Sequence, residues 1–251
     1  MHGNRVKSKL DAGGVATVLV GHSQTSDTID FLGPLGFDGY WLEGEHGPID
    51  WSRIGDLTRA CDLWNMTSVM RVHANEPGLI GRTLDCGVSG LVVPHVDTRA
   101  QAEQVVQAAR FSPAGKRGMY GGRRSYGTTD FFQQANDEIL LVVLIEDILA
   151  VENLDEILQV DHIDVFFVAP TDLAQSMGRL AGSEEPQVQE VVRQTLGRIA
   201  AAGRVPGAMG SIEHLADYRD LGTRFFLTGY DAWIAEGAAR YLDHPVLAGS
   251  R

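Results

Sequence analysis

The sequence predicts a (β/α)8 barrel formed by a single domain over residues 1–251, and three observations carry that prediction. Short apolar runs alternate with amphipathic stretches along the chain, which is the pattern of repeated βα units, and about eight such units can be counted. No linker, low-complexity tract or sudden shift in charge divides the chain. No G-x-G-x-x-G turn follows the first apolar run, whereas a doubly wound sheet usually has fewer strands and such a turn.

The strands are clearest in the middle of the chain. The run Leu140–Ile145 and the run Val165–Val168 show no alternation of polar and apolar residues, so both faces of each must be covered, as in parallel strands of α/β proteins. The predicted strands, in order, are Val15–Val20, Gly39–Leu42, Ser68–Val72, Gly90–Val93, Ile139–Ile145, Asp164–Val168, Val205–Met209 and Arg224–Leu227.

Helical patterns lie between these strands. The last of them, Tyr230–Leu242, has apolar faces at the end of the chain, which indicates a homo-oligomer. The predicted helices are Ser26–Leu35, Trp51–Asp62, Glu76–Cys86, Thr98–Ala109, Ala150–Leu158, Glu185–Ala202, Ile212–Leu221 and Tyr230–Leu242.

The composition is that of an ordinary globular enzyme, with 44% hydrophobic and 22% charged residues. A net charge of -12 and a pI near 5.0 argue against non-specific binding to nucleic acid or to anionic membranes, so a small-molecule ligand is expected. No apolar core follows the positive charges of the first residues, and no run approaches the length of a membrane span. We therefore expect a soluble cytoplasmic protein.

The two cysteines, Cys61 and Cys86, fall within helical patterns and lack metal-ligand spacing. They support neither a disulfide framework nor a zinc knuckle, and we interpret them as small buried residues.

Two carboxylates, Glu146 and Asp172, follow the central strands closely. Parallel α/β sheets place their chemistry just beyond the C-terminal ends of the strands, so both acids are expected where a ligand would bind. Two carboxylates brought together repel unless one takes up a proton, and a hard divalent ion held by oxygen ligands removes that conflict. The pair suggests a Mg²⁺-type site. Alternatively, each acid only begins a helix, stabilised by the positive end of the helix dipole.

Further candidates follow the second, third and fourth predicted strands. His46, in the turn Glu43–Pro48, could move a proton near neutral pH or be an ordinary polar loop residue. Arg71 ends the third strand, where an unpartnered charge would be costly, so it points either at an anion or at one of the acids. His95 after the fourth strand is a weaker candidate, and Asp85, on a helix, is by default a solvated surface acid.

The segment Phe111–Gly127 is too long and glycine-rich for a simple connection, and long ordered loops are usually functional. We expect it to leave the C-terminal side of the barrel. Its arginines, Arg117, Arg123 and Arg124, could meet an anionic substrate, but a subunit interface or the solvent is the favoured interpretation.

These residues together resemble the HpcH/HpaI aldolase family, and the similarity runs in order over nearly the whole chain. The motifs that carry it are Gly36-Phe37-Asp38, Glu45-His46-Gly47-Pro48, Arg71, Leu84-Asp85-Cys86-Gly87, Val92-Val93-Pro94, Ser112-Pro113-Ala114-Gly115-Lys116-Arg117-Gly118, Ile145-Glu146 and Ala169-Pro170-Thr171-Asp172-Leu173.

The resemblance implies a class II, metal-dependent pyruvate aldolase related to 2-keto-3-deoxy-glucarate aldolase and 4-hydroxy-2-oxo-heptanedioate aldolase. The implied fold is a TIM barrel that commonly exchanges its last helix between subunits and assembles as trimers or hexamers. The implied reaction is reversible cleavage of a 4-hydroxy-2-oxo acid to pyruvate and an aldehyde through a metal-stabilised pyruvate enolate. Glu146 and Asp172 would bind the divalent metal, Mg²⁺, Mn²⁺ or Co²⁺.

The resemblance also implies roles for individual residues. Arg71 would steady the enolate oxygen and contact the substrate, and His46 would take part in proton transfer. Asp85, of the same or a neighbouring subunit, would orient that histidine. The backbone N–H groups around Thr171 and Asp172 would hold the pyruvate carboxylate.

Elementary chemistry agrees with these roles. Breaking a carbon–carbon bond beside a ketone leaves an enolate, and a Lewis-acid metal with a cationic arginine stabilises the developing charge. No lysine lies at any predicted strand end, which argues against a Schiff-base mechanism.

Three positions depart from the family pattern. Leu144 stands where the family typically has glutamine, Glu43 replaces the usual acid of the Asp-Gly-Glu-His turn, and Val20-Gly21-His22 stands where an aromatic is common. All three border the expected substrate space, so the aldehyde can differ from that of the best-known members. The rival functions are oxaloacetate decarboxylation, a citramalyl-CoA-like cleavage, and a barrel that binds a keto acid without catalysis. The combination of Arg71 and His46 with the two acids argues against the last.

Overall fold

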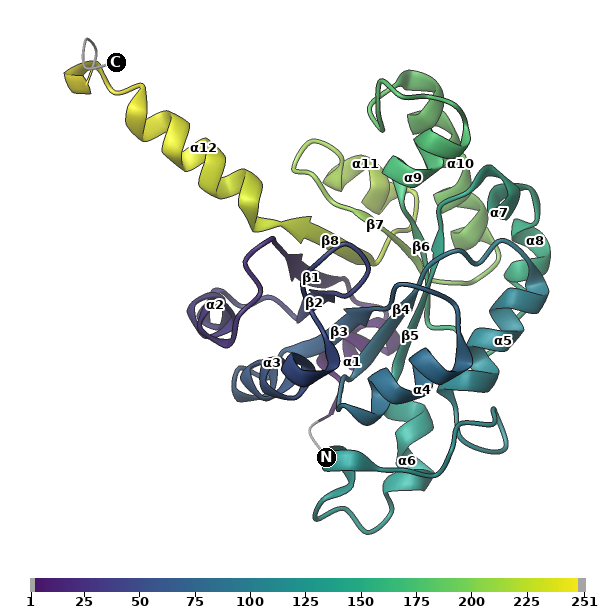
Figure 1. The fold of residues 1–251 in the computed structure, drawn as a ribbon. Coiled ribbons are helices and arrows are strands. Elements are labelled where there is room, and N and C mark those ends of the chain that lie inside the picture. The colour runs from purple at the N-terminus through teal and green to yellow at the C-terminus, as the bar shows by residue number, and fades with distance from the viewer. Residues whose placement is uncertain (1–2, 248–251) are drawn as a thin grey trace.

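The computed structural model describes residues 3–247, in which eight parallel strands close into a barrel in chain order, surrounded by helices (Figure 1). The predicted barrel is confirmed, and residues 1–2 and 248–251 of the predicted domain lie outside the described residues. The strands are β1 Ala16–Val20, β2 Gly39–Glu43, β3 Thr67–Arg71, β4 Gly90–Val93, β5 Leu140–Ile145, β6 Val165–Val168, β7 Pro206–Met209 and β8 Phe225–Gly229.

All eight predicted strands are present, with ends that agree to within two residues. The α-helices are α1 Arg5–Asp11, α2 Ser26–Leu32, α3 Trp51–Leu63, α4 Pro77–Asp85, α5 Arg99–Ala109, α6 Phe131–Glu138, α7 Ile148–Glu152, α8 Leu154–Ile157, α9 Pro170–Ser176, α10 Pro186–Ala201, α11 Leu215–Asp220 and α12 Tyr230–Leu242. Short 3-10 helices are η1 Gly33–Leu35, η2 Gly122–Ser125 and η3 Pro245–Leu247.

The helix predictions need several corrections. The helices α1, α6 and α9 were not predicted, and the single helix expected over Ala150–Leu158 is two short helices that meet at Asn153. Each of these helices has at most eight residues, which is about two turns and too few to show a clear apolar period. The expected helix Ser26–Leu35 ends as the 3-10 turn η1, where Pro34 lies near its start.

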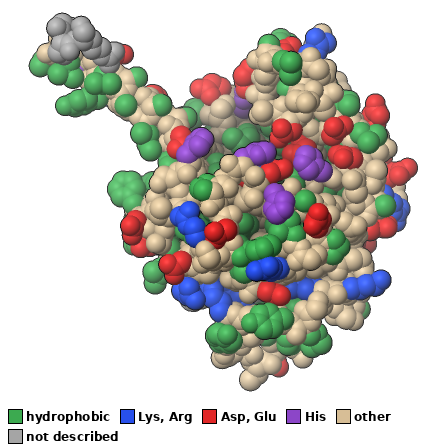
Figure 2. Space-filling view, viewed as in Figure 1, with side chains coloured by type: hydrophobic (Ala, Val, Ile, Leu, Met, Phe, Trp, Pro, Cys, Tyr) green, Lys and Arg blue, Asp and Glu red, His purple; other side chains and the backbone are tan. Residues whose placement is uncertain are grey.

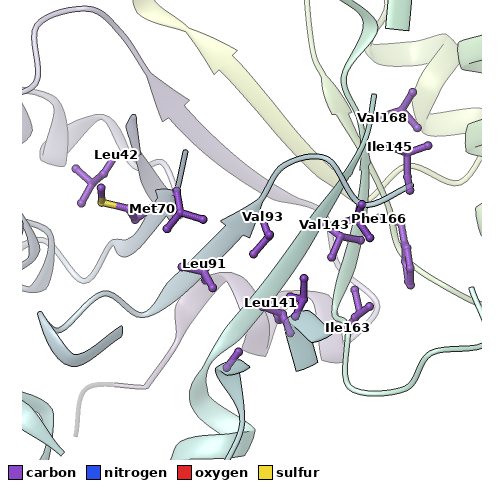
Figure 3. Packing of buried hydrophobic residues seen from close by; sticks show 14 of the residues in the cluster. Leu42, Met70, Leu91, Val93, Leu141, Val143, Ile145, Ile163, Phe166 and Val168 are labelled. Atoms are coloured by element: carbon purple, nitrogen blue, oxygen red, sulfur yellow. The ribbon is translucent and has the colours of Figure 1, made fainter. Parts of the chain in front are cut away.

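The uniformly apolar strands separate two cores. In β5, Leu141, Val143 and Ile145 point outward and pack against the helices (Figure 3). Leu140, Val142 and Leu144 point inward and fill the barrel. Because successive side chains of a strand point to opposite faces, a strand buried on both faces shows no polar alternation.

The same period of two residues orients the strand ends. Trp41 and Val69 belong to the inner core, and two residues later on the same faces come Glu43 and Arg71, which are paired in the β2–β3 register. Glu146 follows the inward-facing Leu144 by two residues. These charged side chains therefore converge over the C-terminal mouth of the barrel.

The segment Phe111–Gly127 was predicted at the wrong end of the barrel. It connects α5 to α6, before β5 begins, so it lies on the N-terminal side. Its arginines are paired within the chain: Arg117 with Asp85 at 2.7 Å, and both Arg123 and Arg124 with Asp62 at 2.8 and 2.9 Å. These cations are largely buried, so neither substrate nor solvent is their partner.

The last helix, α12, projects away from the barrel (Figure 1). Among residues 3–247, no helix is both long and apolar enough to cross a membrane.

Candidate active site

An ion-pair cluster joins the ends of β2 and β3. Arg71 Nε lies 3.0 and 2.9 Å from the two carboxylate oxygens of Glu43, and Arg71 Nη1 lies 2.9 Å from Glu45 Oε2. All three side chains are mostly buried. The sequence left two interpretations open for Arg71, an anion or an acid of the chain, and the structure shows it paired with acids of the chain. Two carboxylates share its one guanidinium group.

Glu43 also shapes the turn that carries His46. Its Oε1 accepts hydrogen bonds from the backbone N–H groups of Glu45 and His46, at 2.8 and 3.0 Å, and Trp41 Nε1 donates to its Oε2 at 3.1 Å. Burial alone would raise the pKa of Glu43, but Arg71 and the backbone donors hold it below its ordinary value. Glu43 is thus the ionised anchor of the turn that carries His46.

The ring of His46 is largely solvent-exposed. Its side chain is 67% accessible, and Nε2 lies 3.9 Å from Glu45 Oε2. An exposed imidazole beside a carboxylate can exchange protons with a molecule bound at the mouth.

Glu146 is buried at the end of β5, with 3% of its side chain exposed. Burial, together with the negative charges of Asp172 and Glu45, raises the pKa of Glu146 to about 6, although a backbone hydrogen bond and the ring of His95 oppose the rise. Asp172 lies in the first turn of α9 and is exposed. The repulsion predicted between these two acids is therefore present.

This donor set fits a hard cation. Within the described part of the chain, no group of three or more His, Cys, Asp or Glu side chains could hold a metal, so Glu146 and Asp172 would share the ion with substrate and water oxygens. Mg²⁺ is commonly bound in that way, through one or two carboxylates, whereas zinc sites usually need three or four protein ligands. A cation here would also offset the negative charges of Asp172 and Glu45, which add to the effect of burial on the pKa of Glu146.

His95 is more central than the sequence indicated. Its backbone N–H donates to Glu146 Oε1 at 2.8 Å, while its ring lies between two acids, with Nδ1 3.3 Å from Glu146 Oε1 and Nε2 3.5 Å from Glu45 Oε1. The backbone has a φ of 56°, which is uncommon for residues other than glycine. The only signal in the sequence was a histidine directly after a strand and a proline.

Asp85 lies at the opposite end of the barrel from His46. It is the last residue of α4, before β4 begins, and Arg117 Nη2 donates to its Oδ1 at 2.7 Å. The expectation that it is a solvated surface acid is wrong, and within one chain it cannot orient His46. Its action on a neighbouring subunit's histidine stays a prediction.

The remaining predicted residues lie at the mouth. Thr171 and Asp172 occupy the first turn of α9, which begins at Pro170 directly after β6. His22, after β1, contacts Asp231 at the start of α12 through both its backbone N–H and its Nδ1, each 3.0 Å from Asp231 Oδ2. Figure 2 shows acidic and histidine side chains gathered on this side of the molecule.

Comparisons with known proteins point in one direction. The sequence model of a family described as HpcH/HpaI aldolase/citrate lyase matches residues 18–235. The chain is 39% identical over 212 residues to a hydroxypyruvate/pyruvate aldolase of Cupriavidus necator, covering 82% of this chain and 79% of the relative. It is 35% identical over 217 residues to a 5-keto-4-deoxy-D-glucarate aldolase of Shigella boydii, covering 85% and 84%.

A solved structure shares the fold. A HpcH/HpaI aldolase/citrate lyase family protein from Burkholderia cenocepacia superposes with a TM-score of 0.88 at 28% identity, covering 95% of this chain and 98% of the other.

Proposed function

The chain belongs to the HpcH/HpaI aldolase/citrate lyase family, and from this membership we propose that it cleaves a 4-hydroxy-2-oxo acid reversibly into pyruvate and an aldehyde. It is a carbon–carbon lyase, and dependence on a divalent metal is typical of the family. The observation that carries the proposal is the pair of acids at the barrel mouth, Glu146 and Asp172: burial raises the pKa of Glu146, and the negative charges of Asp172 and Glu45 add to the rise.

The acids and the absence of a suitable amine favour metal over Schiff-base chemistry. The chain has three lysines, Lys7, Lys9 and Lys116. Two lie on α1, on the N-terminal side of the barrel, and the third follows α5. None can reach a carbonyl carbon at the mouth, which supports the class II assignment.

Glu146 and Asp172 would hold the cation, and we propose Mg²⁺, Mn²⁺ or Co²⁺. When bound, this ion supplies Lewis-acid stabilisation of the negative charge that develops on the keto oxygen. The backbone N–H groups at Thr171 and Asp172 hold the pyruvate carboxylate, and Arg71 adds positive charge beside the enolate oxygen.

The proton steps fall to His46. In cleavage, a base removes the proton of the 4-hydroxyl as the carbon–carbon bond breaks, and an acid then protonates the methylene carbon of the pyruvate enolate. The exposed ring of His46 can approach both positions in a bound substrate, and Asp85 of a neighbouring subunit would orient it.

We also propose a homo-oligomer, a trimer or a hexamer, in which α12 packs on a neighbouring subunit. On this projecting helix Ile234 is 64% and Tyr241 72% exposed, and Trp233 and Leu242 are partly exposed as well. Large apolar side chains gathered on one surface usually mark an interface. Light scattering at micromolar concentration should show the oligomer, and a stable monomer would contradict the proposal. We propose that the protein is located in the cytoplasm.

The test is turnover with and without metal. Pyruvate release from a panel of 4-hydroxy-2-oxo acids should stop in EDTA and return, to different extents, with Mg²⁺, Mn²⁺ or Co²⁺. Glu146→Gln keeps the shape but removes a negative charge, so it should behave like chelation. Full activity in EDTA, or wild-type turnover by Glu146→Gln, would show that the proposed chemistry is wrong.

A further inference from the structure

A cleft opens beside the candidate active site and is not used by the steps above. It has a volume of about 400 Å³ and lies between the ends of β6, β7 and β8 and the loops that follow them. Pro170 and Thr171, which precede Asp172 in the chain, are among its lining residues, so the cleft adjoins the site proposed for pyruvate. Such a volume is ample for the second half of a small substrate.

The ionised groups of this cleft are of one sign. Three of its lining residues are glutamates, Glu184, Glu213 and Glu236, and none is a lysine or an arginine. Hydrogen bonds from its own backbone N–H and from Ser211 lower the pKa of Glu213, so this carboxylate is ionised at neutral pH. A substrate group that carries a second negative charge would be repelled here.

The wall of the cleft holds a histidine in a fixed position. The ring of His214 stacks on Tyr218, with centroids 5.2 Å apart and planes 19° apart, and buried Tyr218 donates to Gln189 Oε1 at 2.8 Å. Ser211 Oγ lies 3.2 Å from His214 Nδ1, and Glu184 Oε2 lies 3.6 Å from His214 Nε2. The result is a row of hydrogen-bonding groups along the cleft wall, which suits a partner with hydroxyl groups.

The order Glu184, His214 and Ser211 resembles a nucleophile relay, but the contacts argue for binding. The serine and the histidine belong to one turn, in which the backbone N–H of His214 donates to Ser211 O at 3.1 Å. Glu184 Oε2 is beyond hydrogen-bond distance of the ring and its side chain is 74% exposed, so it does not hold the imidazole as the third group of a relay would.

We propose that this cleft receives the aldehyde half of the substrate and that this half is an uncharged hydroxyaldehyde, not an aldehyde with its own carboxylate. The inference rests on the proposed lyase function and adds the class of its second substrate. It separates this chain from the relative named for a glucarate, since a glucarate is a sugar diacid.

Two measurements keep the inference distinct from the function on which it rests. Proton exchange at the pyruvate methyl in D₂O, followed by NMR, tests enolate formation without any aldehyde. Aldol addition of pyruvate to glycolaldehyde and glyceraldehyde, against glyoxylate and succinic semialdehyde, tests the class of aldehyde. The uncharged pair should have a kcat/KM at least about tenfold higher. Exchange without this preference overturns the inference alone, whereas absence of exchange overturns the function as well.

Two double variants test whether the glutamates of the cleft cause the preference for uncharged aldehydes. Glu184→Gln/Glu213→Gln should raise the kcat/KM for succinic semialdehyde relative to glyceraldehyde by about tenfold, because the repelling charges are gone. Glu103→Gln/Glu156→Gln, which changes two exposed glutamates on α5 and α8, is the matched control and should leave the ratio unchanged. Equal ratios in both double variants would contradict the assignment.

A second variant tests the hydroxyl recognition without removing the stacking. His214→Phe keeps a ring against Tyr218 but loses the hydrogen bonds, so the kcat/KM for glyceraldehyde should fall by up to about tenfold. The kcat/KM for propionaldehyde, which has no hydroxyl group, should not fall. A parallel loss for both aldehydes would overturn the role of His214.

Discussion

The two ends of the barrel differ in how their charged side chains are paired. At the N-terminal end each buried acid has cationic partners, whereas at the C-terminal mouth acids outnumber cations and lie close together. Because the same strands connect the two ends, the difference reflects what each end does: paired charges at the base support folding, and unbalanced charges at the mouth are available for a ligand.

The base is built from closed ion pairs. Asp38 is fully buried and contacts Lys9 at 2.8 Å and Arg5 at 3.0 Å. Asp164 pairs with Lys7 at 2.7 Å and with the buried Arg110 at 2.9 Å. Charges neutralised in this way leave little attraction for an added ion.

The mouth leaves its charges unbalanced. Arg71 pairs with both Glu43 and Glu45, and the ring of His95 lies between Glu45 and Glu146, while Asp172 adds a further negative charge that acts on Glu146. Burial first, and then these negative charges, raise the pKa of Glu146.

The largest expected effect tests whether an exposed mouth histidine is functional. His46→Ala should slow proton exchange at the pyruvate methyl in D₂O by about 10² to 10⁴, because a positioned proton carrier is lost. His162→Asn is the control at the base, where asparagine tolerates the φ of 67°, and should leave the rate unchanged. If His95→Ala slows exchange and His46→Ala does not, the proton-transfer role belongs to His95.

The next largest effect is a loss of stability when a buried ion pair at the N-terminal end of the barrel is broken. Arg110 is 2% exposed and donates to Asp164, to the carbonyl oxygens of Ile139 and His162 at 2.8 Å, and to that of Asn136. Arg110→Met should lower the free energy of unfolding by about 3 kcal/mol, since buried acceptors lose their donor. Urea unfolding measures it.

The control for this change is Arg198→Met, which removes an exposed pair with Asp155 and a hydrogen bond to the carbonyl oxygen of Val151, and should cost less than about 1 kcal/mol. A variant of Arg110 that is as stable as the wild type would remove the distinction between base and mouth.

A smaller effect, a gain in stability, is expected when the buried negative charge of Glu146 at the mouth is removed. The pKa of Glu146 is raised from its ordinary 4.5 to about 6, so the folded protein binds this proton more tightly than the unfolded chain does. In EDTA the associated stability is present below pH 4.5 and is lost as the pH rises through 6. Glu146→Gln should therefore be more stable than the wild type by about 2 kcal/mol above pH 6.5. Thermal unfolding from pH 4.5 to 7.5 in EDTA measures the difference. A variant that is less stable than the wild type at pH 7 would show that the ionised Glu146 does not destabilise the fold.

The smallest effect concerns the floor of the mouth. Leu144 faces inward, two residues before Glu146, and its side chain offers no hydrogen bond to a molecule at the mouth. Leu144→Gln should change the ratio of kcat/KM values between two aldehydes by less than tenfold, because such a bond contributes about 1 kcal/mol. Complete loss of activity in a folded variant would refute this interpretation.

Much of the fold could be predicted because its signals are local. The runs Leu140–Ile145 and Val165–Val168 must be strands covered on both faces, and eight repeated units leave few alternatives to a closed barrel. The period of two then places Glu43, Arg71 and Glu146 at the mouth. Short helices such as α6 and α9 escaped prediction, since they are too brief to show a period.

The partners of charged residues were decided only by the tertiary structure. Arg71 and Glu43 are far apart in the chain and meet through the β2–β3 register, while Asp85 and Arg117 meet at the base through the segment after α5. His95 became central because its strand neighbours β5, which brings its backbone N–H to Glu146. A sequence specifies which side chains are charged and which way a strand points them, but electrostatic pairing falls off within a few ångströms and depends on packing between distant segments.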